Sequence, residues 1–228
     1  MTDGMEERVK CRGCGGAAPP ADRCPECERL QPFPPGADHW AILGVPPRLA
    51  VDRAALAGRV HELNRRFHPD YYRLRSPEEQ AQSLENSAAV NTAYRTLRDP
   101  VSRAEYVLSQ EGLGEREAAA VKPPADLLAE ILEIQEARQE LTAGGRESPA
   151  LRARLRAAQA DLEARRGATE GALAGLFAGA DAAGADDRRR ILREMRNLLG
   201  RRAYLRTVLR DLEGALDGGD GTEGRADR

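Results

Sequence analysis

Four cysteines in two matched pairs are the first residues of this chain whose types and spacing could do chemistry. Cys11-x-x-Cys14 and Cys24-x-x-Cys27 use every cysteine of the protein, with nine residues between the pairs. Four thiolates at this spacing suit a tetrahedral zinc ion, because each C-x-x-C loop lets two sulfurs approach one metal. Protein ligands would fill all four positions of the tetrahedron. We therefore predict a structural zinc site and not a catalytic one.

Other uses of the cysteine pairs fit less well. Disulfides do not persist in a reducing cytosol, and a redox C-x-x-C belongs on a βαβ unit that the sequence does not show. An iron–sulfur cluster is the alternative to zinc. A segment of about 20 residues cannot bury enough apolar surface to fold unaided, so bound metal should supply much of its folding free energy.

The tripeptide His68-Pro69-Asp70 is the second candidate. It could belong to a catalytic site, ligate a metal, cap a helix end, or be a contact that another protein reads. The sequence contains no GxSxG, HExxH or glycine-rich phosphate loop that would complete an active site. We therefore expect that the protein is not an enzyme, and the remaining readings depend on the elements around the tripeptide.

Composition favours a helical protein without strong charge. The 228 residues are 41% hydrophobic, 32% charged and only 4% aromatic, and the formal net charge is −2. Ala, Leu, Arg and Glu are the dominant residues, and they lose little rotamer freedom in a helix. No apolar run of about 18 residues occurs, so we expect no membrane span, and the acidic start carries no signal peptide. We expect a cytoplasmic protein.

Helices are predicted on both sides of the tripeptide. Asp38 can cap a short helix over 39–43, and Asp52 can cap a longer one that Pro69 ends. The apolar residues of the longer helix fall on one face: Leu56, Val60, Leu63 and Phe67. A capping box at 76–79 opens the next helix. Its expected apolar face is Leu84, Ser87, Val90, Tyr94 and Leu97. The two faces match, so we predict an antiparallel hairpin with the tripeptide exposed at its tip.

The second half of the chain predicts three long helices over residues 125–141, 149–166 and 186–212. Short connections between such helices are typical of an antiparallel bundle. The glycine-rich polar residues 214–228 are predicted to be disordered. The complete domain prediction is 1–36 for the cysteine module and a proline-rich linker, 37–113 for the hairpin domain, 121–213 for the bundle and 214–228 for the tail.

The hairpin region resembles a J-domain over about 75 residues. The segments "DHWAILGVPP", "VHELNRRFHPDYY" and "NTAYRTLRDPVSRAEYVL" follow the order of that family. The resemblance implies a co-chaperone that docks on a DnaK-type ATPase through the tripeptide and the basic helix before it. The residues that would make this contact are His68, Pro69, Asp70, Arg59, Arg65 and Arg66.

The helices after the J-domain narrow the resemblance. "SAAVNTAYRTLRDPVSRAEYVLSQEGL" followed by "LLAEILEIQEARQEL" resembles HscB, the J-type co-chaperone of iron–sulfur cluster assembly. This resemblance implies that the bundle binds an IscU-type scaffold protein, which the co-chaperone brings to an HscA/DnaK-type ATPase. The implied scaffold-binding residues are Leu128, Leu132, Glu133 and Glu136. They could instead be bundle core and a solvated face, although adjacent apolar residues at 127–128 and 131–132 cannot share one seam.

Two rival functions remain. The protein could be a J-domain co-chaperone for a different client. It could also be a basic zinc-containing nucleic-acid-binding protein, since the last predicted helix is rich in arginine. The arginines are Arg188, Arg189, Arg190, Arg193, Arg196, Arg201, Arg202, Arg206 and Arg210. A solvated face that pairs with acidic helices is the simpler interpretation, because no aromatic residues interleave the arginines for base stacking.

Overall fold

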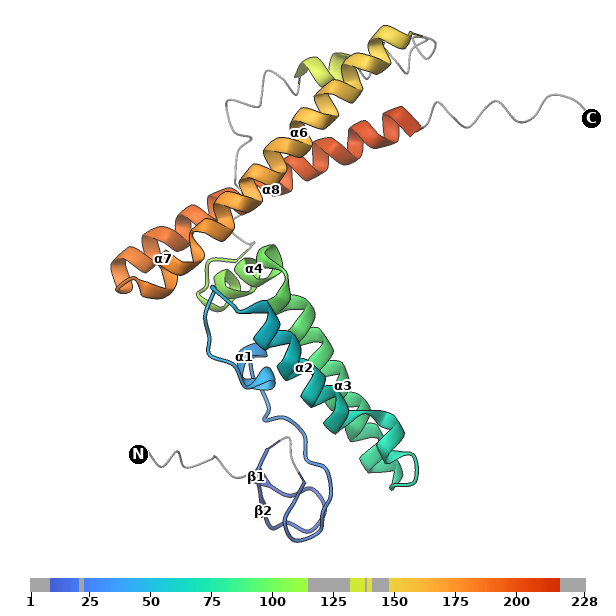
Figure 1. Ribbon diagram of the computed structural model, residues 1–228, viewed down its shortest axis with the longest axis vertical. Helices are drawn as coiled ribbons and strands as arrows, with labels where there is room; N and C mark the ends of the chain where they lie inside the picture. The colour runs from blue at the N-terminus through green and yellow to red at the C-terminus, as the bar shows by residue number, and fades with distance from the viewer. Residues whose placement is uncertain (1–8, 21–22, 115–131, 138, 141–147, 218–228) are drawn as a thin grey trace, which may run out of the picture. The chain divides into compact units, whose positions relative to one another are not determined.

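The computed structural model of the chain describes residues 9–20, 23–114, 132–137, 139–140 and 148–217 (Figure 1). Helices make up most of this part, and its two strands have two residues each, which confirms the predicted all-α fold class. The elements are β1 (Val9–Lys10), β2 (Ala17–Ala18), α1 (His39–Leu43), α2 (Arg53–Phe67), the 3-10 helix η1 (Pro69–Tyr72), α3 (Pro77–Arg98), α4 (Pro100–Gln110), α6 (Pro149–Gly175), α7 (Phe177–Ala182) and α8 (Ala185–Asp217).

Packing divides the chain into two compact units, residues 1–103 and 104–228. Both cysteine pairs and the helical hairpin belong to the first unit, and the division falls inside α4. The predicted domain limits therefore stay predictions. Within the described residues, no helix combines the length and the apolar character that crossing a lipid bilayer requires.

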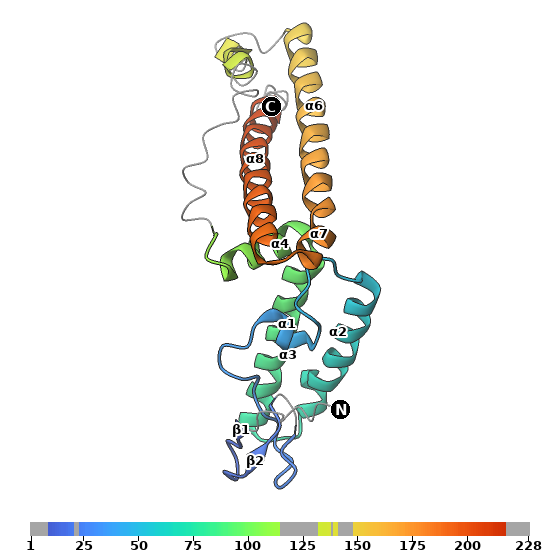
Figure 2. The same cartoon turned by 90° about the vertical axis from the view of Figure 1, so that its left-hand side faces the viewer.

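In the first unit, α2 and α3 form the predicted hairpin (Figure 2). Asp52 caps α2 by accepting the N–H groups of Ala54 and Ala55, and Ser76 caps α3 through the N–H of Glu79. The four apolar residues expected on one face of α2 are buried, as predicted. Burial of each such side chain contributes about 1.5–3 kcal/mol, so this face determines how α2 packs.

The buried face of α3 agrees with the predicted one at Val90 and Leu97 and differs from it in its N-terminal half. Leu84 is 58% exposed, whereas Gln82, Ser83 and Asn86 are buried together with Val90. Burying polar groups is tolerated here because each of the three makes hydrogen bonds to the chain around it. Hydrophobic periodicity alone could not locate this face, since its N-terminal half is polar.

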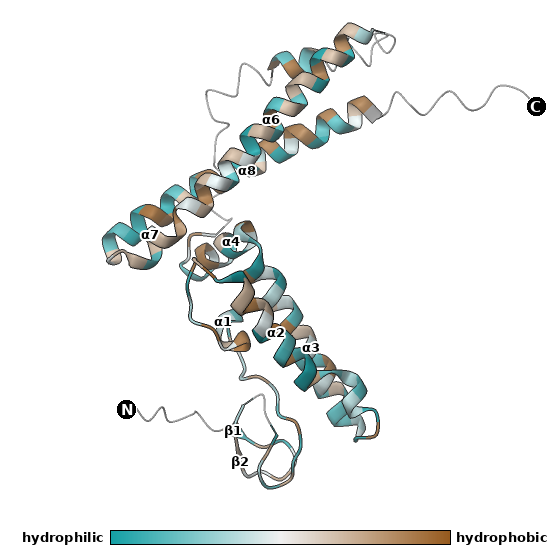
Figure 3. Cartoon of the chain, in the orientation of Figure 1, coloured by the Kyte–Doolittle hydropathy of each residue, from teal (hydrophilic) through white to brown (hydrophobic). Residues whose placement is uncertain are grey.

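In the second unit, α6 and α8 run antiparallel side by side (Figures 1 and 2). Brown and teal residues alternate along both helices in Figure 3, as expected of helices with one buried side. Their shared core also includes Ile134 and Ala137 from the helical residues 132–137, so three helical segments contribute to it. The core cluster consists of Ile134, Ala137, Leu155, Leu162, Leu205, Leu209, Leu212 and Leu216.

Both long helices extend past their predicted ends. α6 continues from residue 166 to Gly175 through Gly167 and Gly171, which are poor helix formers. The reason is burial of Thr169 and Leu173 in the same stretch, because tertiary packing outweighs a propensity cost of about 1 kcal/mol per glycine. α8 reaches Asp217, and the rest of the predicted disordered tail lies outside the described residues.

Candidate functional site

The tripeptide occupies the turn between the paired helices α2 and α3. α2 ends at Phe67, and Pro69 begins the 3-10 helix η1, which matches the preference for proline in the first turn of a helix. The side chains of His68 and Asp70 are 53% and 71% exposed. The predicted exposed turn at the tip of the hairpin is therefore observed, and its use as a contact stays a prediction.

Hydrogen bonds from α3 and η1 to the C-terminal end of α2 hold this turn in one shape. The hydroxyl groups of Ser83 and Ser87 both donate to the backbone oxygen of Phe67, each at 2.7 Å. The hydroxyl of Tyr72, a residue only 2% exposed, donates to the backbone oxygen of Arg66 at 3.1 Å. These bonds satisfy carbonyls that a helix C-terminus leaves without partners, so the turn is anchored while its side chains face solvent.

His68 also caps the turn locally. Its Nδ1 accepts the backbone N–H of Asp70 at 3.3 Å, and the same atom lies 3.6 Å from an oxygen of the Asp70 carboxylate. His68 can therefore cap the turn and still contact a partner protein, as predicted.

The three arginines predicted for docking differ in their surroundings. Arg59 donates from Nε to the backbone oxygen of Leu43 at 3.0 Å and from NH1 to Glu62 at 3.1 Å, so it ties α2 to the end of α1. Arg65 and Arg66 are exposed in the last turn of α2, where cations complement the negative end of the helix dipole. These two therefore offer their charges at the tip of the hairpin.

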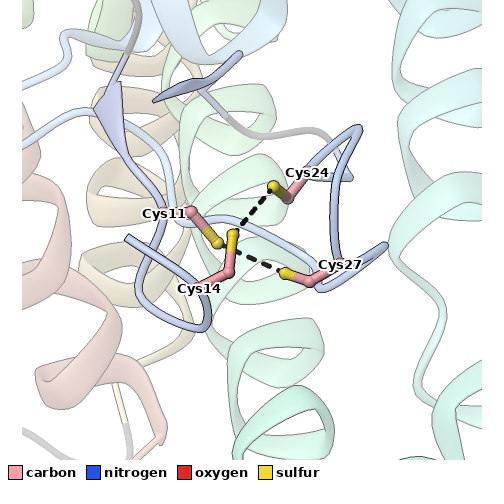
Figure 4. A group of neighbouring side chains, drawn as sticks. All are labelled: Cys11, Cys14, Cys24 and Cys27. Atoms are coloured by element: carbon pink, nitrogen blue, oxygen red, sulfur yellow. Dashed lines mark hydrogen bonds between the residues drawn. The ribbon is translucent and has the colours of Figure 1, made fainter. Parts of the chain in front are cut away.

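The four cysteine sulfurs converge on one point (Figure 4). All four lie within 4.8 Å of one another, with Sγ–Sγ distances of 3.5 Å for Cys11 and Cys27 and 3.7 Å for Cys14 and Cys24. A tetrahedral zinc with sulfur ligands at about 2.3 Å would place its sulfurs about 3.8 Å apart. The donor set and its spacing therefore fit one metal ion.

Two similar loops build the cluster. In the first loop the N–H of Cys11 bonds the oxygen of Gly16, and in the second the N–H of Cys24 bonds the oxygen of Arg29. The N–H of Gly13 also points at the sulfur of Cys11, with N and Sγ 3.2 Å apart. Such backbone donors stabilise thiolates, which are the form that binds metal.

The thiol pKa values show why the cluster suits a cation. The N–H of Cys14 is the main influence that lowers the pKa of Cys11 to about 6, against desolvation. The N–H of Gly16 lowers the pKa of Cys14, but desolvation and three neighbouring sulfurs outweigh it and raise that pKa to about 12. One thiolate therefore opposes the ionisation of the others, and a divalent cation at their centre would remove this conflict.

A hydrogen-bonded chain that the sequence did not reveal connects the cluster to α3. Gln31, 1% exposed, donates from Nε2 to the sulfur of Cys11 at 3.3 Å, and its backbone oxygen accepts from Asn86 at 3.0 Å. Gln82 donates to Asn86 and accepts from Arg12, whose own N–H bonds the Gln31 side chain. In the sequence, the one sign of this chain was the pair of polar residues Gln82 and Asn86, four positions apart on a predicted helix.

The residues predicted to bind a scaffold protein lie partly in the described chain. Leu132 is 54% exposed, and Glu133 and Glu136 are also exposed on the same helical segment. Ile134 and Ala137 face the core of the unit instead, and Glu133 lies 3.5 Å from Arg154 of α6. Leu128 lies outside the described residues. The three described residues therefore share a surface that the bundle does not cover.

Comparison with known proteins identifies the family. No family model matches the chain. Co-chaperone protein HscB homolog of Vibrio vulnificus (strain YJ016) is 34% identical over 116 residues, which are 51% of this chain and 68% of that protein. This chain belongs to the HscB co-chaperone family. Iron-sulfur cluster co-chaperone protein HscB of Homo sapiens is 37% identical over 131 residues, 56% of either protein.

Solved structures of HscB proteins have the same fold. The crystal structure of human co-chaperone protein HscB has a TM-score of 0.66 and 26% sequence identity, over 90% of this chain and 97% of the human chain. Chaperone HscB from Vibrio cholerae, at 22% identity, has a TM-score of 0.55 over 80% of this chain and 99% of its own. The HscB relatives are named as co-chaperones, and their names state no catalytic activity.

Proposed function

We propose that this HscB family member stimulates the ATPase of a DnaK/HscA-type chaperone and delivers an IscU-type scaffold protein to it during iron–sulfur cluster assembly and transfer. The observation that carries the proposal is the His68-Pro69-Asp70 turn, which is exposed between two paired helices and flanked by Arg65 and Arg66. The name of the human relative, an iron–sulfur cluster co-chaperone, supports the choice of client.

The proposed mechanism places the chemistry on the partner. The Asp70 carboxylate offers acceptor oxygens to cationic donors of the ATPase, while Pro69 and the anchored ends of the turn keep this group in a fixed position. A ligand shifts an equilibrium only by its differential affinity for the two states. The turn and the basic end of α2 would therefore bind the hydrolysing conformation of the ATPase more tightly than its other conformations.

Substitution of Asp70 tests the proposal. Asp70→Asn keeps the size of the side chain but removes its charge, and a hydrogen bond to a charged group contributes about 1.5–3 kcal/mol. We expect stimulation of the host's DnaK-type ATPase to fall at least about tenfold, with unchanged circular dichroism. Asp52→Asn is the matched control, since asparagine caps a helix as well as aspartate does. Stimulation that survives in Asp70→Asn would contradict the proposed function.

The metal proposed for the cysteine cluster is zinc in a structural role. Cys11, Cys14, Cys24 and Cys27 would occupy all four positions around it, and no position would remain for a substrate. Zinc would hold together the two cysteine loops, which lie at the start of the first unit. The four free thiols fit a reducing compartment, and the cytoplasm is the proposed location.

Two experiments separate this proposal from its rivals. Retrieval of a different client in place of a cluster scaffold, with the ATPase still stimulated, would favour a J-domain co-chaperone for that client. A nucleic-acid mobility shift at physiological salt that persists in His68→Gln would favour a nucleic-acid binder. The ion pairs of Arg202 with Glu170 and of Arg188 with Glu111 support the view that α8 uses arginines to pair with acids of its own unit.

A further inference from the structure

The side chain of Gln31 joins the two cysteine loops. Its Nε2 donates to the sulfur of Cys11 at 3.3 Å and to the backbone oxygen of Arg29 at 2.8 Å. Its Oε1 accepts the backbone N–H of Arg12 at 3.2 Å. The oxygen of Arg29 also accepts the N–H of Cys24. This one amide therefore contacts both loops and lies next to a proposed metal ligand.

These three bonds determine how the amide of Gln31 is oriented. The oxygen of Arg29 needs a donor and the N–H of Arg12 needs an acceptor, so only one placement of the amide nitrogen and oxygen satisfies both. Gln31 is 1% exposed, and a buried polar group left without its partner is costly. The bonds therefore form together only when the two loops lie in the arrangement that brings the four sulfurs to one point.

The backbone of Gln31 is bound to the hairpin. Its oxygen accepts from Nδ2 of Asn86, which is also 1% exposed, at 3.0 Å. Further along the proline-rich linker, the ring of Phe33 meets the ring of Phe67 edge to face, with centroids 5.6 Å apart. Phe67 is the last residue of α2. The linker is therefore held at one end by the cysteine cluster and at the other by the base of the His68-Pro69-Asp70 turn.

Asn86 lies on the face of α3 that closes this turn. Residues three apart in a helix are neighbours on one face, and Ser83 stands three positions before Asn86. The hydroxyl groups of Ser83 and Ser87 both donate to the backbone oxygen of Phe67. Hydrogen bonds therefore lead from the cluster through the linker and α3 to the carbonyl group just before the turn.

Bound metal would complete this connection. A segment as small as the two loops buries too little apolar surface to fold unaided, so the loops depend on a cation at the four sulfurs for their arrangement. Without the cation, the Gln31 amide would no longer find Cys11 and Arg29 in place together. Its backbone oxygen would then be free to leave Asn86. Metal occupancy would thus decide whether the linker supports the turn.

We propose that metal binding at the cysteine cluster and docking of the ATPase at the His68-Pro69-Asp70 turn are coupled, with Gln31 as the positioning residue that couples them. The inference rests on the proposed function and adds regulation by a divalent cation to the same contact. Coupling between two ligands is reciprocal. The ATPase therefore strengthens zinc binding by the same factor by which zinc strengthens ATPase binding.

The zinc Kd of the full chain tests this coupling, measured by competition with a chromophoric chelator with and without the host's DnaK-type ATPase. We expect saturating ATPase to lower the zinc Kd of the wild-type protein about tenfold, within the usual range of coupling between two sites. In Asn86→Ala this effect should fall below about twofold, because the linker is no longer bonded to α3. Asn91→Ala is the matched control, since Asn91 is an exposed asparagine of the same helix, and it should respond as the wild-type protein does.

A second variant reports on the contact with the sulfur directly. Gln31→Met keeps an unbranched side chain but removes the donor, and loss of an outer-shell hydrogen bond should raise the zinc Kd about tenfold. In the cobalt-substituted protein, the sulfur-to-cobalt charge-transfer band should shift to longer wavelength, because the Cys11 thiolate donates electrons more strongly without its N–H partner. A merely structural role for Gln31 would leave this band in place.

The outcomes separate this inference from the proposed function. The inference is overturned by a wild-type zinc Kd that does not respond to the ATPase, by a full response in Asn86→Ala, or by an unshifted cobalt band in Gln31→Met. Circular dichroism checks the fold of each variant, and Gln31→Met replaces Asn86→Ala in the coupling experiment if the latter unfolds. If Asp70→Asn still loses stimulation in those cases, the proposed function stands and only the role of Gln31 fails.

Discussion

At the scale of single residues, Gly15 and Glu28 occupy the same backbone position in the two cysteine loops. Each donates its N–H to the oxygen of a cysteine four residues earlier, Cys11 in one loop and Cys24 in the other. Their φ angles are 78° and 57°, in the left-handed region that favours glycine. Among the described residues other than glycine, Glu28 alone has such a φ angle.

This asymmetry predicts opposite effects of two substitutions on zinc affinity. A left-handed conformation costs a residue with a Cβ about 1–2 kcal/mol, and the greater freedom of glycine in the unfolded chain offsets about 0.4–1 kcal/mol of that. The backbone strain wins, so Glu28→Gly should stabilise the module and Gly15→Ala should destabilise it. A Cβ at Gly15 would meet only the Lys10 side chain at 3.7 Å, an ordinary contact.

Competition with a chromophoric chelator measures the effect, because folding of the module and metal binding are coupled. We expect zinc affinity to rise about twofold to fivefold in Glu28→Gly and to fall by a similar factor in Gly15→Ala. If zinc affinity changed in the same direction in both variants, the left-handed backbone conformation would not be what determines the affinity of the site.

At the scale of elements, polar side chains of α3 connect it to the end of α2 and to the linker after the cysteine module. Ser83 and Ser87 of α3 close the end of α2, and Asn86 on the same helix binds the linker at Gln31. One face of α3 therefore forms hydrogen bonds both to the end of α2 and to the linker. Leucines at these positions would give only non-directional packing. Directional bonds are better suited to keep a short turn in one conformation.

The helical segment 132–137 yields a prediction about scaffold binding. Leu132 is 54% exposed although the same segment buries Ile134, so its side chain is available to a partner. Burial of a leucine contributes about 1.5–3 kcal/mol, and Leu132→Ala should weaken binding of an IscU-type scaffold about tenfold. Isothermal titration calorimetry measures this Kd.

Leu84 provides the matched control for this variant, because it is a leucine of similar exposure, 58%, in the first unit. Leu84→Ala should bind the scaffold as the wild-type protein does, and both variants should stimulate the ATPase normally in the absence of scaffold. Equal scaffold affinities for the two variants would remove Leu132 from the proposed surface.

At the scale of the whole molecule, one chain carries a proposed ATPase contact and a proposed scaffold contact in separate units. Linking two binding sites makes the second binding event intramolecular and raises the effective concentration of the partner. The cysteine module contacts the hairpin through Gln31 and Phe33, so a change in the module can reach the proposed ATPase contact.

Removal of zinc should therefore affect one function and spare the other. Treatment with a chelator is expected to raise the Kd for the ATPase about tenfold, because the module would no longer support the base of the turn through Gln31 and Phe33. The helical circular dichroism should change little, since the described regular structure of the module is limited to β1 and β2. Scaffold affinity should remain unchanged. An unaltered Kd for the ATPase in the zinc-free protein would show that the cysteine module does not contribute to ATPase binding.

Local patterns in the sequence were enough to predict most of the described helices, two of their caps and the gathering of the four cysteines. Asp52 and Ser76 act as caps as expected, and the apolar face of α2 is the buried one, because capping and helical periodicity depend on residues within a few positions. The four-cysteine cluster also followed from spacing alone, since a metal accepts few arrangements of four sulfurs.

Contacts between residues far apart in the chain were decided only by the tertiary structure. The buried polar face of α3, the bond from Asn86 to Gln31 and the position of Arg23 over Tyr72 each join segments that no local rule connects. A polar residue is buried only when a distant partner satisfies it, and its own sequence neighbourhood carries no record of that partner. The extension of α6 through two glycines has the same cause, because packing against α8 outweighs local propensity.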